Sequence, residues 1–350
     1  MTSIRKNIFS LLERYPLIVD FARSVLGSKL VINSYFYHKY CLNSAKRYDA
    51  KRPYGSLRVN IETGLACNAR CIMCTKQSYP LKIGTMSNQL YEKIIGEAKA
   101  LGVKHVILSI YGEPLLDKHF LDWARLSDRE GIKFSFYTNG SLLTEDIARQ
   151  LLTMKYFHHI YFSVNGFSKK TYEEIMIGLD RDVVFKNIER FLILKGEMRS
   201  NVLVNVNCVI FEKNISEKKL LNKYFKEQKG VDCVYFPMLR NRGGTKLDVE
   251  LGCEDVSFSP LTQHGRNLLP CKFLWEDLFI YWNGDVGVCC EDTATRRIIV
   301  GNANLSNLKD IWSGKKMSGL RSLHLNDMRH RHPVCGKECT YNTVWLKPRA

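Results

Sequence analysis

From residue 57 to about residue 238, apolar stretches of strand length alternate with stretches of helical periodicity, and this alternation is the strongest constraint on the fold. The expected strands cover 57–63, 104–110, 132–138, 158–164, 202–210 and 232–237. The expected helices lie between them, near 86–100, 117–130, 144–153, 181–195 and 216–228. Strand–helix units in series place their strands parallel in one sheet. The sequence therefore predicts an α/β fold with an open sheet or a partial barrel.

Several expected strands alternate polar with apolar residues. Strands of parallel sheets covered on both faces are usually near-continuous apolar runs, and an ordinary eight-stranded barrel fills its interior with branched apolar side chains. The polar members here include Asn60, Glu62, Asn205 and Asn207. They predict a wetter interior in which these four residues orient a polar ligand. The alternative is that some of them lie at strand ends in solvent.

Three cysteines follow the first expected strand in a C-x3-C-x2-C run, Cys67, Cys71 and Cys74, with no fourth ligand close by. A structural zinc ion takes four protein ligands, so three thiols on one short loop suit it poorly. They suit a cubane iron–sulfur cluster with one iron left open. An open iron indicates chemistry rather than a structural role.

Length, charge and cysteine content narrow the class of protein. A chain of 350 residues allows one large domain and a smaller one. Twelve cysteines without a secretory signal or a membrane-spanning apolar run indicate a reducing, cytoplasmic compartment.

The net charge of +17 is concentrated at the ends, with +7 in residues 1–56 and +6 in residues 311–350. This leaves open solvated surface, an anionic substrate or peripheral contact with an anionic membrane. No nucleic-acid motif accompanies the charge, so a nucleic acid is not expected.

With its neighbouring motifs, the cysteine run resembles the signature of the radical SAM superfamily. Met73 matches the apolar position near adenine in that family. Further markers follow the next three expected strands in order, namely Gly112 and Glu113, then Thr138-Asn139-Gly140, then Ser163 to Asn165. The resemblance implies a partial (β/α)6 TIM-like barrel with its site at the C-terminal strand ends.

The resemblance also implies roles for these residues. Cys67, Cys71 and Cys74 would bind a catalytic 4Fe–4S cluster whose open iron takes S-adenosylmethionine. Glu113 would hold the amino group of S-adenosylmethionine by a charge-assisted hydrogen bond. The remaining residues expected to bind this cofactor are Met73, Gly112, Asn139, Ser163 and Asn165.

Residues 271–350 hold five of the twelve cysteines and a strong turn signal, Asn283-Gly284, between two apolar runs. This region resembles a truncated SPASM, or twitch, domain of radical SAM enzymes. The resemblance implies one auxiliary 4Fe–4S cluster with four ligands, Cys271, Cys289, Cys335 and Cys339. Cys290 is an alternative to Cys289 as ligand, a spare buried thiol or a hydrogen-atom donor. A four-cysteine zinc site is the alternative for the whole set.

These features divide the chain into four expected parts. They are a basic helical extension at 1–56, the radical SAM core barrel at 57–240, a connector at 241–270 and the auxiliary-cluster domain at 271–350. The aromatic and basic segment 35–40 would fit an interface or a helix packed on the body.

The resemblance implies a radical SAM oxidoreductase. It would cleave S-adenosylmethionine reductively to a 5′-deoxyadenosyl radical and abstract hydrogen from a small polar substrate, sugar-like or aminocyclitol-like. The auxiliary cluster would accept the second electron, and a flavodoxin-like or ferredoxin-like protein would supply the first. The alternatives are a peptide-modifying maturase, an epimerase with a cysteine hydrogen donor, and a non-enzymatic iron–sulfur or zinc protein. Residues 1–56 read as helical, without the strand ribbon of a leader-peptide module, which favours the small substrate.

Overall fold

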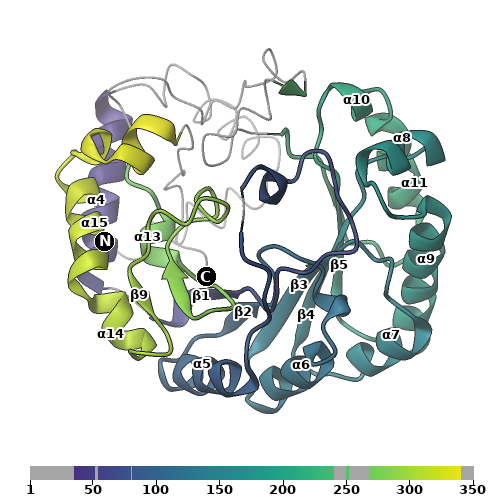
Figure 1. The fold of residues 1–350 in the computed structure, drawn as a ribbon, viewed down its shortest axis with the longest axis horizontal. Helices are drawn as coiled ribbons and strands as arrows, with labels where there is room; N and C mark the ends of the chain where they lie inside the picture. The colour runs from purple at the N-terminus through teal and green to yellow at the C-terminus, as the bar shows by residue number, and fades with distance from the viewer. Residues whose placement is uncertain (1–34, 52–53, 80, 240–249, 252–268, 340–350) are drawn as a thin grey trace, which may run out of the picture.

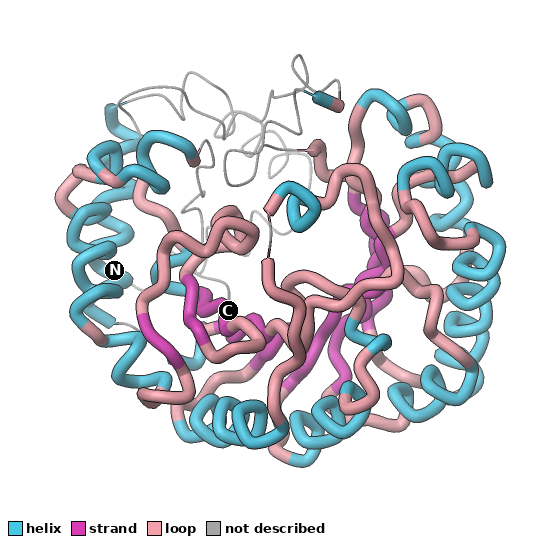
Figure 2. The backbone as a smooth tube through the Cα atoms, in the orientation of Figure 1, coloured by secondary structure: helices cyan, strands magenta, loops and turns pink. Residues whose placement is uncertain are grey.

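The computed structural model describes residues 35–51, 54–79, 81–239, 250–251 and 269–339. One nine-stranded sheet runs through them in the order β6-β5-β4-β3-β2-β1-β7-β8-β9. The strands curve around an interior, and most of the helices lie outside them (Figures 1 and 2). The predicted partial barrel is confirmed.

All six predicted strands are present within a few residues of their expected bounds. They are β1 Arg58–Ile61, β2 His105–Ile107, β3 Lys133–Thr138, β4 Phe157–Ser163, β5 Leu203–Asn207 and β6 Cys233–Tyr235, and each pairs in parallel with its neighbour. One face of strands β1 to β5 is apolar and buried; it includes Val59, Val106, Phe134, Phe136, Ile160, Phe162, Val204 and Val206. Burial of these residues between sheet and helices supplies the main driving force for this half of the fold.

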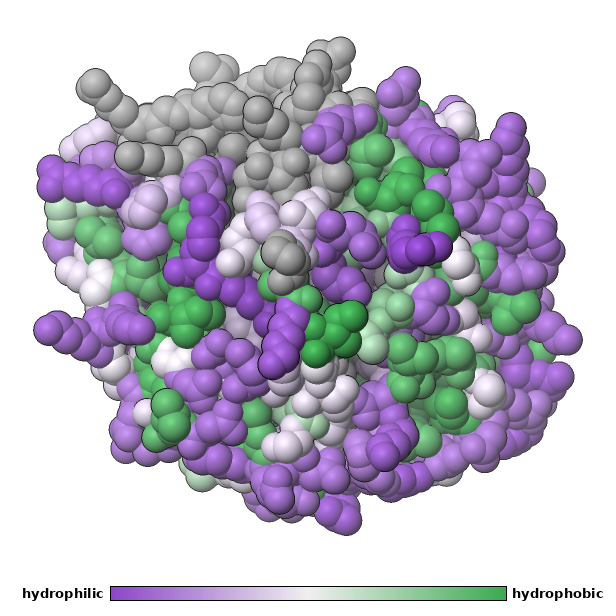
Figure 3. All heavy atoms as spheres, in the orientation of Figure 1, coloured by the Kyte–Doolittle hydropathy of each residue, from purple (hydrophilic) through white to green (hydrophobic). Residues whose placement is uncertain are grey.

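The helices follow the strands as predicted. They are α5 Asn88–Ala100, α6 Phe120–Arg129, α7 Glu145–Leu152, α8 Lys169–Ile175, α9 Arg181–Glu197, α10 Glu212–Ile215 and α11 Lys218–Glu227. Side-chain caps start three of the longer ones, because Ser87, Thr144 and Asp180 each accept a hydrogen bond from a backbone amide of the first turn. The short helices α8 and α10 were not predicted, since they are too short to show a helical period. Hydrophilic side chains cover much of the outer surface in Figure 3, with smaller apolar patches between them.

The C-terminal part extends the same sheet. The predicted hairpin is confirmed as β7 Asp277–Ile280 and β8 Asp285–Gly287, with Gly284 at φ +89° in the turn. β9 Gly301–Asn302 pairs next to β8, and β7 pairs in parallel with β1. This last pairing was not predicted. The helical elements here are α13 Phe273–Glu276, α14 Leu308–Ser313, α15 Lys315–Leu325, η5 Arg329–Arg331 and the π-helical turn η6 Pro333–Glu338. The division of the chain into four domains stays a prediction.

The helix α4, Tyr35–Lys51, packs on the C-terminal part of the chain. His38 Nε2 lies 2.8 Å from a carboxylate oxygen of Asp327, and Trp275 Nε1 donates to Asp49 at 2.8 Å. Of the two expectations for this aromatic segment, the packed helix is what the structure shows. Residues 1–34, most of the expected connector and Cys253 lie outside the described residues. Among the helices that are described, none has the length and apolar character to cross a membrane.

The junction between β1 and β7 carries a buried polar cluster. Asp277, 2% exposed, accepts hydrogen bonds from Arg58 at 2.6 Å and from Asn60 Nδ2 at 3.1 Å. The Asn60 amide also donates to the carbonyl of Leu278 at 3.1 Å. These contacts fix the register in which the C-terminal strands join the barrel.

We expect Asp277→Ala to lower the free energy of unfolding by about 3 kcal/mol, because it leaves the partly buried Arg58 guanidinium without its carboxylate. The matched control is Lys99→Ala, which breaks the exposed pair with Glu130 and should lower the free energy of unfolding much less, because solvent screens that pair. Urea unfolding followed by circular dichroism measures both. Equal losses in the two variants would show that the β1–β7 junction does not depend on this cluster.

Candidate functional site

Cys67, Cys71 and Cys74 lie on the loop that leads from β1 to the short helix η2, Thr75–Ser78, and all three thiols are partly buried. The Ala69 amide donates to Cys67 Sγ at 3.4 Å. Backbone amides of the loop also bind carbonyls at the end of α8. The middle of the loop is thus held against the end of α8.

The three thiols share one electrostatic environment. Burial raises the pKa of the Cys67 thiol, and it raises that of Cys71 to about 12. The neighbouring thiols of the run raise both values further, because thiolate charges so close together repel each other. A cationic metal centre would reverse this preference and favour the thiolates. The donor set fits an iron–sulfur cluster.

Glu113 joins the loops that follow β1, β2 and β3. Its carboxylate accepts hydrogen bonds from the Leu115 amide at 3.2 Å, the Thr138 hydroxyl at 2.8 Å and the Asn139 amide at 2.7 Å. The Asn139 side chain in turn donates to Asn68 Oδ1, inside the cysteine run, at 2.9 Å. Burial raises the pKa of Glu113. The sequence predicted these residues separately, and the structure brings them into one network.

Gly112 is held where no other residue fits. Its φ is +82°, and a Cβ atom added there would lie 2.4 Å from the Gly64 carbonyl oxygen and 2.9 Å from that of Ala66. The next amide, that of Glu113, donates to the same Ala66 carbonyl at 2.8 Å. The loop after β2 therefore lies directly against the loop that carries the cysteines.

Ser163 is the last residue of β4 and Asn165 lies two residues beyond it, and the two side chains differ in their exposure. Ser163 is partly exposed, whereas Asn165 is buried and its Oδ1 accepts from the Val209 amide at 2.8 Å. Asn214 donates to the Asn165 carbonyl at 2.9 Å. The Asn165 side chain thus ties the loop after β4 to the loop after β5.

Met73 lies within the cysteine run, partly buried against the core.

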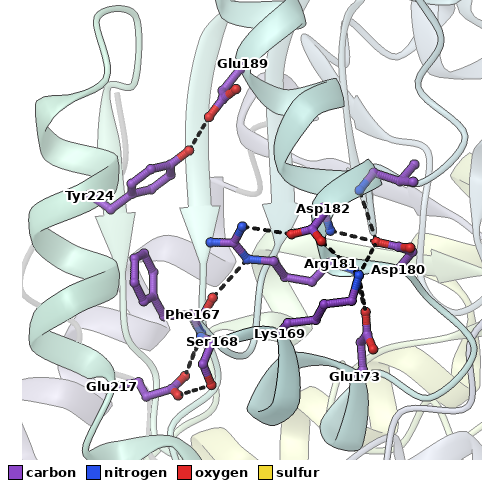
Figure 4. Close-up of polar contacts among 11 residues, drawn as sticks. Phe167, Ser168, Lys169, Glu173, Asp180, Arg181, Asp182, Glu189, Glu217 and Tyr224 are labelled. Carbon is purple, nitrogen blue, oxygen red and sulfur yellow. Dashed lines mark hydrogen bonds and ion pairs between the residues drawn. The ribbon is translucent and has the colours of Figure 1, made fainter.

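The segment that follows Asn165 is anchored by charged side chains (Figure 4). Glu217 accepts from the Phe167 amide and from the Ser168 hydroxyl, each at 2.6 Å. Arg181 donates to the Phe167 carbonyl at 3.0 Å and stacks over the Phe185 ring, with its guanidinium carbon 3.7 Å from the ring centre. The loop after β4 is therefore rigidly placed at the rim of the barrel.

A second centre lies in the C-terminal part. Cys271, Cys289, Cys335 and Cys339 all line one cavity, together with residues of α13, α15, η5 and η6. Cys290 is not among the residues that line it, and its thiol donates to Glu291 at 3.5 Å. This arrangement favours Cys289 over Cys290 as the ligand of an auxiliary cluster.

His324 lines the same cavity, and its hydrogen bonding indicates whether a cluster fits there. Its Nδ1 accepts from the Cys271 amide at 3.1 Å, so Nε2 carries the proton of the neutral ring. Nε2 is buried and has no hydrogen-bond partner among the described residues. An orphaned buried donor is costly, and the sulfur atoms of a cluster would accept its hydrogen bond. The cavity fits an iron–sulfur cluster.

In the described part of the chain, no three His, Cys, Asp or Glu side chains converge on one ion position. A cubane cluster does not need such convergence, because each thiolate binds a different iron atom.

Two contacts join the two centres, and neither could be predicted from the sequence pattern. Arg296 donates to both carboxylate oxygens of Glu62, at 2.7 and 2.9 Å, and Glu62 is fully buried. Burial raises the pKa of Glu62 to about 7, while Arg296 opposes that rise. The Tyr111 hydroxyl lies 2.5 Å from the hydroxyl of Thr75 and accepts from that of Thr293 at 3.3 Å.

These contacts correct one expectation. Asn60 and Glu62 are buried and bound to protein groups, so they are structural residues rather than residues that orient a substrate. Asn205 and Asn207 remain partly exposed on β5, where the sequence analysis expected polar interior residues.

Two family models match the chain. The Radical SAM superfamily model covers residues 61–210, and the iron-sulfur cluster-binding SPASM model covers residues 271–340. The chain therefore combines a radical SAM domain with a SPASM domain. It is an iron–sulfur enzyme that uses a 4Fe–4S cluster and S-adenosylmethionine, and its SPASM domain implies an auxiliary iron–sulfur cluster.

Two curated relatives extend over most of this radical SAM chain. One is the tungsten-containing aldehyde ferredoxin oxidoreductase cofactor-modifying protein of Pyrococcus furiosus, 23% identical over 79% of this chain and 85% of the relative. The other, from Methanothermobacter marburgensis, is described as a probable GTP 3′,8-cyclase. It is 26% identical over 81% of this chain and 96% of the relative.

Solved structures share the fold. BtrN in complex with AdoMet and 2-DOIA has a TM-score of 0.51 at 16% identity, over 82% of this chain and 97% of BtrN. Streptococcus suis SuiB bound to S-adenosylmethionine has a TM-score of 0.58 at 17% identity, over 97% of this chain and 86% of SuiB. The enzyme anSMEcpe with bound AdoMet has a TM-score of 0.56 at 18% identity, over 83% of this chain and 90% of that one.

We expect Gly112→Ala to lose the first cluster, because the new methyl group collides with the backbone of the cysteine loop. The matched control is Gly102→Ala, whose φ is also positive at +73° but whose Cβ would meet no atom within 4 Å. Both substitutions destabilise the fold by about 1–2 kcal/mol, because a residue with a Cβ atom is strained at positive φ. Iron content after anaerobic reconstitution separates them, and equal iron in both would contradict the close approach.

We expect Cys289→Ala to lose about half of the bound iron after reconstitution, since one of two 4Fe–4S clusters loses a ligand. Cys290→Ala is the matched control, with the same chemical change one residue away, and should keep the full iron content. The reverse pattern would make Cys290 the ligand.

Proposed function

We propose that this chain is a radical SAM oxidoreductase that dehydrogenates a small polar, sugar-like or aminocyclitol-like substrate. The observation that carries the proposal is the cavity lined by Cys271, Cys289, Cys335 and Cys339. Four thiolates would occupy all four irons of a cubane cluster, leaving none to bind a substrate. The natural role of such a cluster is electron transfer, which turns hydrogen abstraction into a two-electron oxidation.

The bound cofactors would supply reductive cleavage of S-adenosylmethionine, abstraction of a substrate hydrogen atom and acceptance of one electron at the auxiliary cluster. The chain would hold the first cluster through Cys67, Cys71 and Cys74. An external one-electron donor, flavodoxin-like or ferredoxin-like, would reduce it.

The residues proposed to surround S-adenosylmethionine are Met73, Gly112, Glu113, Asn139, Ser163 and Asn165. A carboxylate offers about four acceptor sites, and three protein donors already point at Glu113, so room is left for an ammonium group. The hydrogen bonds from Thr138 and Asn139 would orient the carboxylate before the cofactor arrives. Gly112 would bring the loop close enough to share the site with the cysteines.

Asn205 and Asn207 are the proposed contacts of the substrate. They lie on β5, and Asn205 is in register with Tyr161 on β4, which stacks on Tyr137 of β3 at a centroid distance of 4.4 Å. Tyr137 is 40% exposed. Amide groups and partly exposed tyrosines offer hydrogen bonds and apolar ring faces together, a combination that suits a hydroxylated ring.

The curated relatives support a small substrate, because their names refer to a cofactor and to GTP. Peptide modification stays the second candidate, because solved structures of similar fold hold peptides: SuiB its precursor peptide SuiA, and anSMEcpe the Cp18Cys peptide.

We expect the reconstituted protein to release 5′-deoxyadenosine from S-adenosylmethionine when dithionite is added, measured by liquid chromatography. Cys71→Ala should abolish this release, whereas Cys335→Ala should retain it, because the second cluster is not needed for cleavage. If the wild-type protein released no 5′-deoxyadenosine, the proposed radical SAM oxidoreductase activity would be contradicted.

The same assay, supplied with small-metabolite or peptide fractions, separates the candidate outcomes by mass spectrometry. A dehydrogenase yields a small product lighter by two hydrogen atoms. An epimerase leaves the mass unchanged in water and adds one deuterium in heavy water, and a maturase changes only peptides.

A further inference from the structure

A buried arginine lies in the wall of the auxiliary cavity. Arg329 is 2% exposed and lines the cavity together with the four cysteines. Its guanidinium donates to Cys339 Sγ at 3.5 Å, to the Cys335 carbonyl at 3.0 Å and to the Leu269 carbonyl at 2.7 Å. A cation is therefore held against one proposed ligand sulfur and against the backbone of a second ligand.

The other charges in the cavity wall are mainly acidic. Glu291, Asp292 and Glu338 line it, and Arg297 is the other lining arginine. Arg297 pairs with Glu338 at 2.6 Å and lies 3.8 Å from Asp292, so these two carboxylates compensate its positive charge. Arg329 is thus the cation of this wall that directly contacts a thiol.

Arg329 lies near more than one of the proposed ligands. Besides its hydrogen bond to Cys339 Sγ, it donates to the backbone carbonyl of Cys335, and Cys271 and Cys289 line the same cavity. A fixed positive charge in a buried site attracts negative charge on the atoms around it. The guanidinium therefore favours negative charge on the sulfur atoms of this cavity.

Charge and hydrogen bonding at the sulfurs set the reduction potential of a cluster. Reduction adds one negative charge, which a fixed cation nearby stabilises. We propose that Arg329 raises the reduction potential of the auxiliary cluster and so makes it an electron acceptor for the oxidation. This inference rests on the proposed function, because it takes these four cysteines as the cluster's ligands.

The test uses the full-length chain with Cys67, Cys71 and Cys74 all changed to Ala, so that only the auxiliary cluster is loaded. The ratio of reduced to oxidised cluster is read from the electron paramagnetic resonance of the reduced form at a series of fixed solution potentials. Arg329→Gln should lower this ratio at least tenfold at a given potential, a shift of about 59 mV for one electron. Arg329→Lys keeps the charge and should stay near the parent. Arg331→Gln removes an exposed arginine two residues away and should leave the ratio unchanged.

Each outcome decides between this inference and its rivals. An unchanged ratio in Arg329→Gln, or an equal fall in Arg329→Lys, overturns the electrostatic role. Arg329→Met, also uncharged, serves if the Gln variant does not load. If neither neutral variant takes up iron, Arg329 is needed for assembly and the proposal fails. If the parent triple variant takes up no iron, the ligand assignment itself is wrong, a failure that the 5′-deoxyadenosine assay does not register.

Discussion

The first site depends on the close approach of two loops at Gly112. The carbonyls of Gly64 and Ala66 leave no space for a side chain, so the loop after β2 lies against the loop that carries the three cysteines. Glu113 then reaches Thr138 and Asn139 after β3, and Asn139 reaches back to the cysteine loop. The parallel sheet is what brings these loop segments together, because it places the carboxyl ends of neighbouring strands along one edge. Three thiols on a flexible loop would be a weak site, whereas this interlocking holds them in a preorganised one.

The first site could be predicted because each of its motifs follows a strand whose end the sequence pattern marks. Thr138 and Ser163 lie at the last positions of β3 and β4, as the local pattern indicated. The pairing of β7 with β1 could not be predicted, since nothing local in 277–280 specifies a partner two hundred residues away. The structural roles of Asn60 in β1 and of Glu62 just after it could not be predicted for the same reason. Asn60 and Glu62 have the alternation of ligand-facing residues, but their partners come from the C-terminal part of the chain.

The pairing of β7 with β1 brings the C-terminal part against the barrel, and the contacts between the two centres then fix its orientation. A buried ion pair such as Glu62–Arg296 gains little net stability, because desolvation offsets most of its attraction. The contact instead fixes orientation: Nη2 of Arg296 donates to both carboxylate oxygens, and a small rotation of the C-terminal part would leave a buried carboxylate without its partner. The hydroxyl of Tyr111 adds a second tie, one residue before Gly112. The cysteine loop and the auxiliary cavity are therefore held as one rigid arrangement.

The auxiliary cavity must accommodate two opposite charge states. Before iron binds, burial keeps the thiol of Cys335 neutral, and a buried guanidinium would then carry uncompensated positive charge. The carbonyls of Cys335 and Leu269 meet this cost, because they accept from Arg329 whatever the state of the thiols. An iron–sulfur cluster held by the four cysteines would require their thiolate forms and so make the cavity anionic, which the same guanidinium would stabilise. An arginine held by backbone carbonyls is thus compatible with both states, whereas one held only by a carboxylate would be neutralised by it and could not favour the thiolates.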